Sequence, residues 1–171
     1  VFLSAFTTKT AVYVLARTFA GEELLIYVGA TMTMFPIYFA VIENDLRRVL
    51  GYSMINQIGF MVVGIGIGTE LAVNGAVAHA FNDVIFKGLL FMSMGAVLHV
   101  TGRITGTDMG GLYKSMPMTA GLCSIGALAI AGVPLLSGFF SKDEILYEAF
   151  REGHTVLWLI GAVLSGRPIA A

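Results

Sequence analysis

The chain has 171 residues, of which 57% are hydrophobic and 12% charged, and its formal net charge is −1. Soluble domains carry about 25% charged residues, so a mean hydropathy of +0.84 excludes an ordinary soluble domain and favours an integral membrane protein. The low net charge gives no indication of a nucleic-acid partner. The lone Cys123 excludes an internal disulfide, and no metal-ligand spacing occurs, so we expect no metal site and no cofactor.

Apolar segments follow one another along the whole chain, several of them close to the ~20 residues that a membrane-spanning helix needs. They cover residues 2–16, 24–42, 49–67, 71–99, 119–136, 139–150 and 155–164. The sequence therefore predicts an all-α, polytopic transmembrane helical bundle of about five to six spans. We expect one membrane-embedded domain over 1–171, with a kink in the second segment at Pro36.

The third segment, 49–67, differs from the others in its polar and small residues. It carries Ser53, Asn56 and Gln57 on its early turns. Four glycines in it would allow close contacts between helices: Gly51, Gly59, Gly64 and Gly66.

The two ends of the chain suggest a piece of something larger. The first apolar segment begins at once, and the last, 155–164, has about half the length needed to span. We therefore expect an internal fragment, or a truncated product, of a larger polytopic protein.

Basic residues in the connections predict an orientation. Four of them fall on one side of the predicted spans: Arg47, Arg48, Arg103 and Lys114. The opposite side has Arg17 and several glutamates. Because cytoplasmic loops are enriched in Lys and Arg, the loop of Arg47 and Arg48 is expected to face the cytoplasm.

The fourth segment contains three ionisable side chains inside an apolar run. His79, Asp83 and Lys87 are spaced by four residues, so on a helix they share one face over roughly 12 Å. Ionisable groups in the membrane are costly and usually mark a functional path. Asp83, one turn from Lys87, is the expected partner of that lysine. A static ion pair that only fixes packing is the alternative.

Other polar residues extend this pattern. The ordinary pKa of an imidazole, near 6.5, would suit His79 to a proton relay, although a structural histidine is the alternative. Asn82 is expected to support the line of polar groups. Lys9 lies in the first segment among Thr7, Thr8 and Thr10, whose hydroxyls could bind its ammonium, unless the lysine extends to the membrane interface.

The stretch 132–144 predicts a helix that breaks within the membrane. Pro134 removes a backbone donor, and glycines flank it at 132 and 138. Broken helices often mark ion sites in transporters, and Lys142 follows the break. The alternative is an ordinary loop in which Ser141 caps a helix that begins with Asp143 and Glu144.

Four stretches together resemble a known family. They are ENDLRRVLGYSMINQIGFMVVGIG at 43–66, HAFNDVIFKGLLFMSMGAVLH at 79–99, MGGLYKSMP at 109–117 and GFFSKDEIL at 138–146. Their order and spacing are similar to those of the proton-conducting antiporter-like subunits of respiratory complex I and of Mrp-type cation/proton antiporters.

The resemblance implies two inverted repeats of five helices, each with a broken helix. This chain would hold the end of the first repeat and most of the second. Lys87 then corresponds to the central relay lysine, and Lys142 to the lysine or glutamate of the second broken helix. His79 corresponds to the histidine eight residues before the central lysine, and Lys9 to a bridging lysine. Many members have a histidine where this chain has Asp83, which would set a carboxylate against Lys87.

The predicted function is therefore proton translocation in the D-type subunit of an Mrp-like Na⁺/H⁺ antiporter. The expected path runs along Lys9, His79, Asp83, Lys87 and Lys142, supported by Asn82, Asp143, Glu144 and Pro134. The expected partners are other membrane subunits, the lipid bilayer, protons and Na⁺, in a bacterial inner membrane.

Two alternatives remain open, and neither involves covalent chemistry within this chain. The first is an antiporter-like, proton-pumping subunit of complex I or of a related membrane-bound hydrogenase. The second is a nonconducting membrane scaffold, in which the buried charges only fix the packing.

Overall fold

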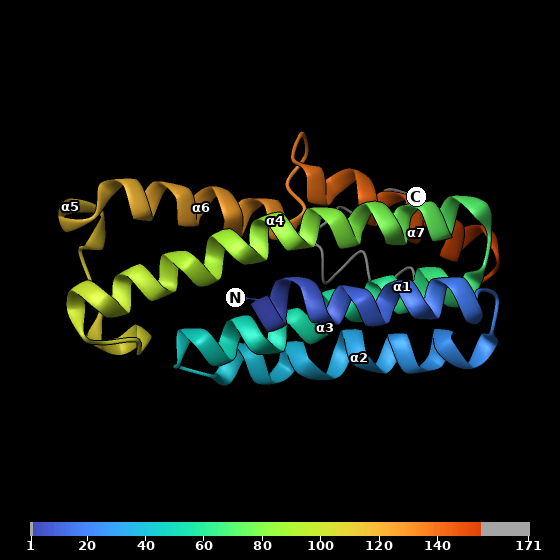
Figure 1. Ribbon diagram of the computed structural model, residues 1–171, viewed down its shortest axis with the longest axis horizontal. Helices are drawn as coiled ribbons and strands as arrows, with labels where there is room; N and C mark the ends of the chain where they lie inside the picture. Colours follow the sequence, from blue (N-terminus) through green and yellow to red (C-terminus); the bar gives the residue numbers. More distant parts are fainter. Residues whose placement is uncertain (1, 155–171) are drawn as a thin grey trace.

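The structure is a computed structural model that describes residues 2–154. Within that range the regular elements are all helical (Figure 1). They are η1 (Leu3–Thr7), α1 (Thr8–Thr18), α2 (Glu23–Ile42), α3 (Leu46–Ile67), α4 (Glu70–Thr101), η2 (Gly106–Asp108), α5 (Leu112–Ser115), α6 (Pro117–Ala131) and α7 (Ser137–Arg151). The predicted all-α architecture is confirmed.

Three helices, α2, α3 and α4, are long and apolar enough to cross a membrane. The helix α6 is apolar but shorter, with 15 residues, and α2 continues through Pro36. The 32 residues of α4 extend over about 48 Å at 1.5 Å per residue. That exceeds the ~30 Å hydrocarbon core of a bilayer, and Figure 1 shows α4 along most of the molecule. The predicted segment 155–164 lies outside the described residues.

Local signals in the sequence fix where α3 and α4 begin. The side chain of Asp45 accepts hydrogen bonds from the backbone N–H of Arg47 at 2.8 Å and of Arg48 at 3.3 Å. The Thr69 hydroxyl likewise accepts from the N–H of Ala72. These caps satisfy donors that the first turn of a helix leaves free, so α3 starts three residues before the predicted segment 49–67.

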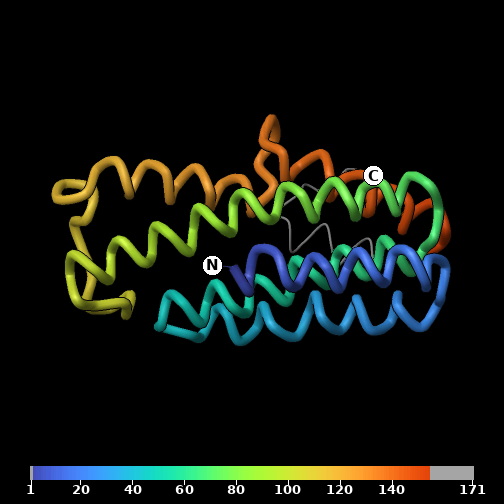
Figure 2. Tube along the Cα trace, in the orientation of Figure 1, coloured from blue at the N-terminus to red at the C-terminus, as the bar shows by residue number. Residues whose placement is uncertain are grey.

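Helices α2 and α3 lie antiparallel and side by side (Figures 1 and 2). Their backbones approach closely because glycines lie at the contact. A Cβ on Gly29 would lie 2.7 Å from the backbone nitrogen of Val63, and one on Gly59 2.8 Å from the carbonyl oxygen of Gly29. Gly66 is similarly tight against Ile26 of α2 and Gly64 against Ala72 of α4, as predicted, but Gly51 faces open space.

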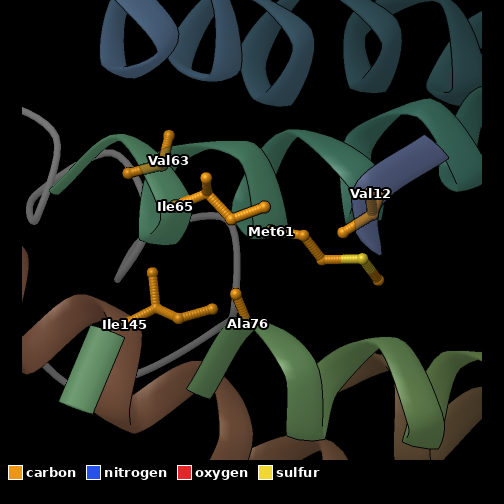
Figure 3. Packing of buried hydrophobic residues seen from close by; sticks show 6 residues of the cluster. All are labelled: Val12, Met61, Val63, Ile65, Ala76 and Ile145. Carbon is orange, nitrogen blue, oxygen red and sulfur yellow. The ribbon is translucent and has the colours of Figure 1, made fainter. Parts of the chain in front are cut away.

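The apolar core gathers side chains from four helices around α3 (Figure 3). Its buried members are Val12, Met61, Val63, Ile65, Ala76 and Ile145, which come from α1, α3, α4 and α7. Side chains on α3 thus face the same helices that carry the predicted polar residues.

A short backbone clasp joins two connections at one end of the bundle. Asp45 pairs with Thr105 in an antiparallel bridge, and the N–H of Gly106 donates to the carbonyl of Asn44 at 2.9 Å. The clasp sets Arg47 and Arg48 near the connection that contains Arg103. Three of the four basic residues that predicted the orientation are thereby gathered at one end.

The predicted break between α6 and α7 is confirmed. Helix α6 ends at Ala131, five residues before the end of the predicted segment 119–136. Gly132 has φ +76°, a left-handed conformation that glycine adopts without strain, and Pro134 follows. The turn also holds Leu135 at φ +77°, and it projects from the bundle in Figure 2.

Candidate functional site

The three ionisable residues in the middle of α4 lie on its inward face, as their spacing predicts. His79, Asp83 and Lys87 each have a relative exposure of 0%. Buried ionisable groups are uncommon and need partners. The partners come from α1, α3 and α7.

Asp83 forms its ion pair with Lys9 of α1. The predicted pairing of Asp83 with Lys87 is therefore wrong for this conformation, because the ammonium of α1 reaches the carboxylate instead. Neither carboxylate oxygen of Asp83 accepts a hydrogen bond from within the described residues beyond this pair. The carboxylate thus depends on a lysine from another helix.

Lys87 points instead to α3. Its Nζ donates to the Ser53 hydroxyl oxygen at 2.8 Å and to the Leu50 carbonyl at 3.4 Å. Within residues 2–154, both hydrogen-bond partners of this buried ammonium are uncharged oxygens. The static Asp83–Lys87 pair is not formed.

Lys9 lies at the junction of η1 and α1. Its Nζ donates to the Ser4 carbonyl at 3.2 Å and to the Thr8 hydroxyl at 3.3 Å. The hydroxyl of Thr10 instead donates to the carbonyl of Phe6. With its side chain only 9% exposed, Lys9 turns into the bundle, not towards an interface.

His79 bridges α3 and α7 through its two ring nitrogens. Nδ1 lies 2.8 Å from the Ser141 hydroxyl, and Nε2 lies 2.9 Å from Oε1 of Gln57. Gln57 itself donates to Asn56 at 3.0 Å. His79 is thereby the point where the broken-helix region meets the polar residues of α3.

The role of Ser141 differs from the alternative drawn from its sequence. Helix α7 begins at Ser137, with Leu136 as its N-terminal flanking residue, so Ser141 lies inside the helix and does not cap it. The start of α7 is instead held by Asn82 of α4, whose amide donates to the Ser137 carbonyl at 3.2 Å.

The other predicted supporting residues take separate positions on α7. Asp143 is exposed, and Glu144 is half-buried. The Cβ of Glu144 lies against the backbone of α4, 2.9 Å from where a Cβ on Gly75 would be. This contact brings α7 close to α4, whereas Asp143 faces away from the buried cluster.

Lys142 is held by the break that precedes it. Its Nζ donates to the carbonyl of Ile130 at 2.7 Å. In a continuous helix that carbonyl would accept from the N–H of residue 134, but Pro134 has no N–H. The ammonium also lies 5.3 Å from the centre of the Phe60 ring, within cation–π range. The end of α6, with Pro134 after it, thus leaves the Ile130 carbonyl free to position Lys142.

Four polar residues of this site were not predicted to belong to it: Ser53, Asn56, Gln57 and Ser141. The first three interrupt an apolar segment at helical spacing, and that pattern is visible in the sequence. It does not reveal which charged residue each would contact.

The cluster contains groups that bind and release protons. Among the described residues, no three His, Cys, Asp or Glu side chains come together as metal ligands. The buried groups are three lysines, one histidine and one aspartate, joined by hydroxyls and amides. Such an arrangement can hold and pass protons between helices.

The fold is that of an antiporter-like membrane protein. Residues 1–166 match the family described as NADH:quinone oxidoreductase/Mrp antiporter, TM. The chain belongs to this family and, with its apolar helices, is an integral membrane protein. The resemblance drawn from its motifs is confirmed.

Individual relatives come from both branches of the family. The chain is 39% identical over 153 residues to the D-type subunit of the Na(+)/H(+) antiporter of Alkalihalophilus pseudofirmus, covering 84% of this chain and 31% of that protein. It is 39% identical over 173 residues to the L-type subunit of the NADH-quinone oxidoreductase of Pseudomonas aeruginosa, covering 94% and 27%.

A solved structure of the Mrp complex from Dietzia sp. DQ12-45-1b is also similar. The TM-score is 0.90 with 26% sequence identity, over 95% of this chain and 32% of the matched chain. The chain therefore spans about a third or less of the length of these relatives.

Proposed function

We propose that this chain is part of the proton-translocating D-type subunit of an Mrp-like Na⁺/H⁺ antiporter. The proton path is made up of Lys9, His79, Asp83, Lys87 and Lys142. The other partners are further membrane subunits of the same complex, the lipid bilayer and Na⁺. The likeness to the D-type subunit of an antiporter and to an Mrp complex supports this choice.

The observation that carries the proposal is the position of Asp83 between two lysines. It pairs with Lys9, while Lys87 lies one turn away on the same helix and donates only to neutral oxygens. A carboxylate favours the protonated form of a neighbouring amine. When Asp83 turns from one lysine to the other, the lysine that it leaves releases its proton more readily, so movement of one carboxylate drives transfer.

A redox-driven complex is the second candidate function. The likeness to the L-type subunit of an NADH-quinone oxidoreductase covers 94% of the chain, more than the 84% for the antiporter protein. The same lysines would then respond to electron transfer in partner subunits. Isolating the full-length protein with its partner subunits distinguishes these two functions. Quinone-linked activity indicates the redox complex, whereas cation-driven proton flux without quinone-linked activity indicates the antiporter.

The orientation of the chain in the membrane is part of the same proposal. The end of the bundle with Arg47 and Arg48, at the start of α3, faces the cytoplasm of a bacterial cell, with the inner membrane around α2, α3 and α4. The gathering of basic residues at the clasp supports this orientation through the positive-inside rule.

The deciding experiment is proton flux in proteoliposomes that hold the full-length protein with its partner subunits. Lys87→Ala is compared with the unmutated protein at equal assembly, and we expect flux to fall at least about 100-fold, as for loss of a proton-transfer group. Lys114→Ala is the control, because that exposed lysine lies on α5 outside the cluster. Unchanged flux in Lys87→Ala would refute the relay and favour the nonconducting scaffold.

A further inference from the structure

Two amide side chains connect His79 to a backbone carbonyl. Nδ2 of Asn56 donates to the Thr33 carbonyl at 2.6 Å, and Nε2 of Gln57 donates to Oδ1 of Asn56 at 3.0 Å. Oε1 of Gln57 then lies 2.9 Å from Nε2 of His79. Thr33, Asn56 and Gln57 are each 4% exposed, so the chain of hydrogen bonds runs through the interior from α2 to α4.

The carbonyl at one end sets the direction of every bond in this chain. A backbone carbonyl only accepts hydrogen bonds, so the amide nitrogen of Asn56 must face Thr33. Its oxygen must then face Gln57, which turns the nitrogen of Gln57 to Asn56 and its oxygen to His79. An amide oxygen also only accepts. Nε2 of His79 therefore carries a hydrogen.

The other ring nitrogen meets a group that adapts to either protonation state. The Ser141 hydroxyl lies 2.8 Å from Nδ1 and can also donate to the Ser137 carbonyl at 3.3 Å. When Nδ1 is bare, Ser141 donates to it. When Nδ1 is protonated, it donates to Ser141, whose hydroxyl rotates to Ser137. Both states leave every polar group with a partner.

From this geometry we propose that Asn56 and Gln57 lock the tautomer of His79, so that His79 exchanges protons only at Nδ1 and only through Ser141. When a proton binds to the Ser141 oxygen, the hydroxyl proton moves to Nδ1. Release from His79 follows the reverse order, so the number of protons is conserved. The inference rests on the proposed function for its role in transport. Asn56 and Gln57 are positioning residues.

Charged groups from several helices act on His79. The cations that act on it are Lys142 from α7, Lys9 from α1 and Lys87 from its own helix, and the buried anion of the cluster is Asp83. Lys142 follows Ser141 directly in the sequence. The lysine of the broken helix is therefore next in sequence to the exchange point, whereas the hydrogen-bond partner of Nε2 among the described residues is the neutral amide of Gln57.

The tautomer is measured by ¹⁵N nuclear magnetic resonance on the full-length complex labelled at histidine, with His79→Gln used to assign the signals. Protonated and bare ring nitrogens have well-separated shifts. We expect neutral His79 to carry its hydrogen on Nε2 in the unmutated protein, and on Nδ1 in Gln57→Met, where the acceptor is gone. Asn56→Leu, which does not touch His79, should give a mixture because the Gln57 amide is free to turn.

Proton flux is measured on the same preparations. Gln57→Met should lower flux about tenfold or more, since a wrong histidine tautomer disables proton transfer. Ser141→Ala should lower it similarly, and Ser141→Thr, which keeps the hydroxyl, should restore most of it. Ser93→Ala is the control, because that buried hydroxyl donates only to the carbonyl of Leu89 in its own helix.

Two results would overturn the lock: a neutral His79 that carries its hydrogen on Nδ1 in the unmutated protein, or an unchanged Nε2–H tautomer of the neutral ring in both Gln57→Met and Asn56→Leu. Full flux in Ser141→Ala would overturn exchange through the serine. The expected spectra together with unchanged flux in Lys87→Ala would sustain the lock while refuting the proposed function.

Discussion

Asp83 depends on Lys9 because no other cation forms an ion pair with it within the described residues. Both groups are almost wholly removed from solvent, so each is costly without the other. Lys87, which a helical repeat of four places one turn from Asp83, is held by α3 instead. At the scale of single residues, the site therefore consists of charges whose partners lie on different helices.

A double-mutant cycle measures the coupling free energy between Lys9 and Asp83. We expect Lys9→Met or Asp83→Asn alone to destabilise the assembled protein by about 3–5 kcal/mol, because each leaves an uncompensated buried charge. The double variant should lose much less than the sum. Thermal unfolding of the complex in detergent gives the values.

The exposed pair of Arg48 and Glu43, at 3.7 Å, is the control for that cycle. Its coupling should be below about 1 kcal/mol, since exposed ion pairs contribute little. Additive effects of Lys9→Met and Asp83→Asn would mean that the buried pair does not form.

Glycine and proline residues determine two of the contacts between the helices of the bundle. Gly29 and Gly59 let α2 and α3 touch, and this contact places Thr33 beside Asn56. Pro134 ends the hydrogen-bond ladder of α6 and leaves the Ile130 carbonyl to Lys142. In both places a single residue type decides where a polar side chain of the site can bind.

Gly59→Ala should destabilise the protein by about 1–3 kcal/mol through overpacking. A Cβ there would lie 2.7 Å from the backbone nitrogen of Thr33 and 2.8 Å from the Gly29 carbonyl oxygen, neither of which can move cheaply. Gly51→Ala in the same helix meets nothing within 4 Å and should be neutral or stabilising by about 0.5–1 kcal/mol. Equal melting temperatures for the two variants would contradict the close backbone contact.

Pro134→Ala tests the link between the helix break and Lys142. The substitution supplies an N–H that competes for the Ile130 carbonyl, so we expect proton flux to fall by roughly three- to tenfold, about 1 kcal/mol of lost positioning. Pro117→Ala is the control, because Pro117 occupies the start of α6, where no N–H is needed. If both variants keep full flux, Pro134 does not position Lys142.

At one end of the bundle, the clasp joins the α2–α3 connection to the α4–α5 connection. The Asn44 amide donates to the Thr107 hydroxyl at 2.9 Å, and its oxygen accepts from the Thr107 N–H at 3.2 Å. Beside it, Glu43 accepts from the backbone N–H of Asp45 and Asn44, which lowers the pKa of its carboxyl below the ordinary value. The clasp fixes how the α2–α3 hairpin sits against α4.

Asn44→Ala should lower stability by about 1–2 kcal/mol, because two hydrogen bonds of the clasp are lost. Thermal unfolding of the full-length complex measures this loss. The matched control is Asn74→Ala, an exposed asparagine near the start of α4, where alanine favours the helix. A smaller loss for Asn44→Ala than for Asn74→Ala would show that the clasp does not hold the connections together.

Local patterns in the sequence were enough to predict the helices, the break and the identity of the main charged residues. These features depend on local signals: apolar runs of spanning length, capping residues at Asp45 and Thr69, and Pro134 after α6. Each signal acts on residues close to it in the sequence. The repeat of four from His79 to Lys87 likewise predicted one buried face, because helical geometry alone requires it.

Which of these groups contact one another depends on how the helices pack. The sequence placed Asp83 with Lys87 because both lie on one helix, but the helix α1 brings Lys9 to the carboxylate, and α3 offers Ser53 to Lys87. The partners of His79 come from residues 22 positions before it and 62 after it. Such contacts depend on how the helices pack, through glycines and a shared apolar core, and no local pattern encodes them.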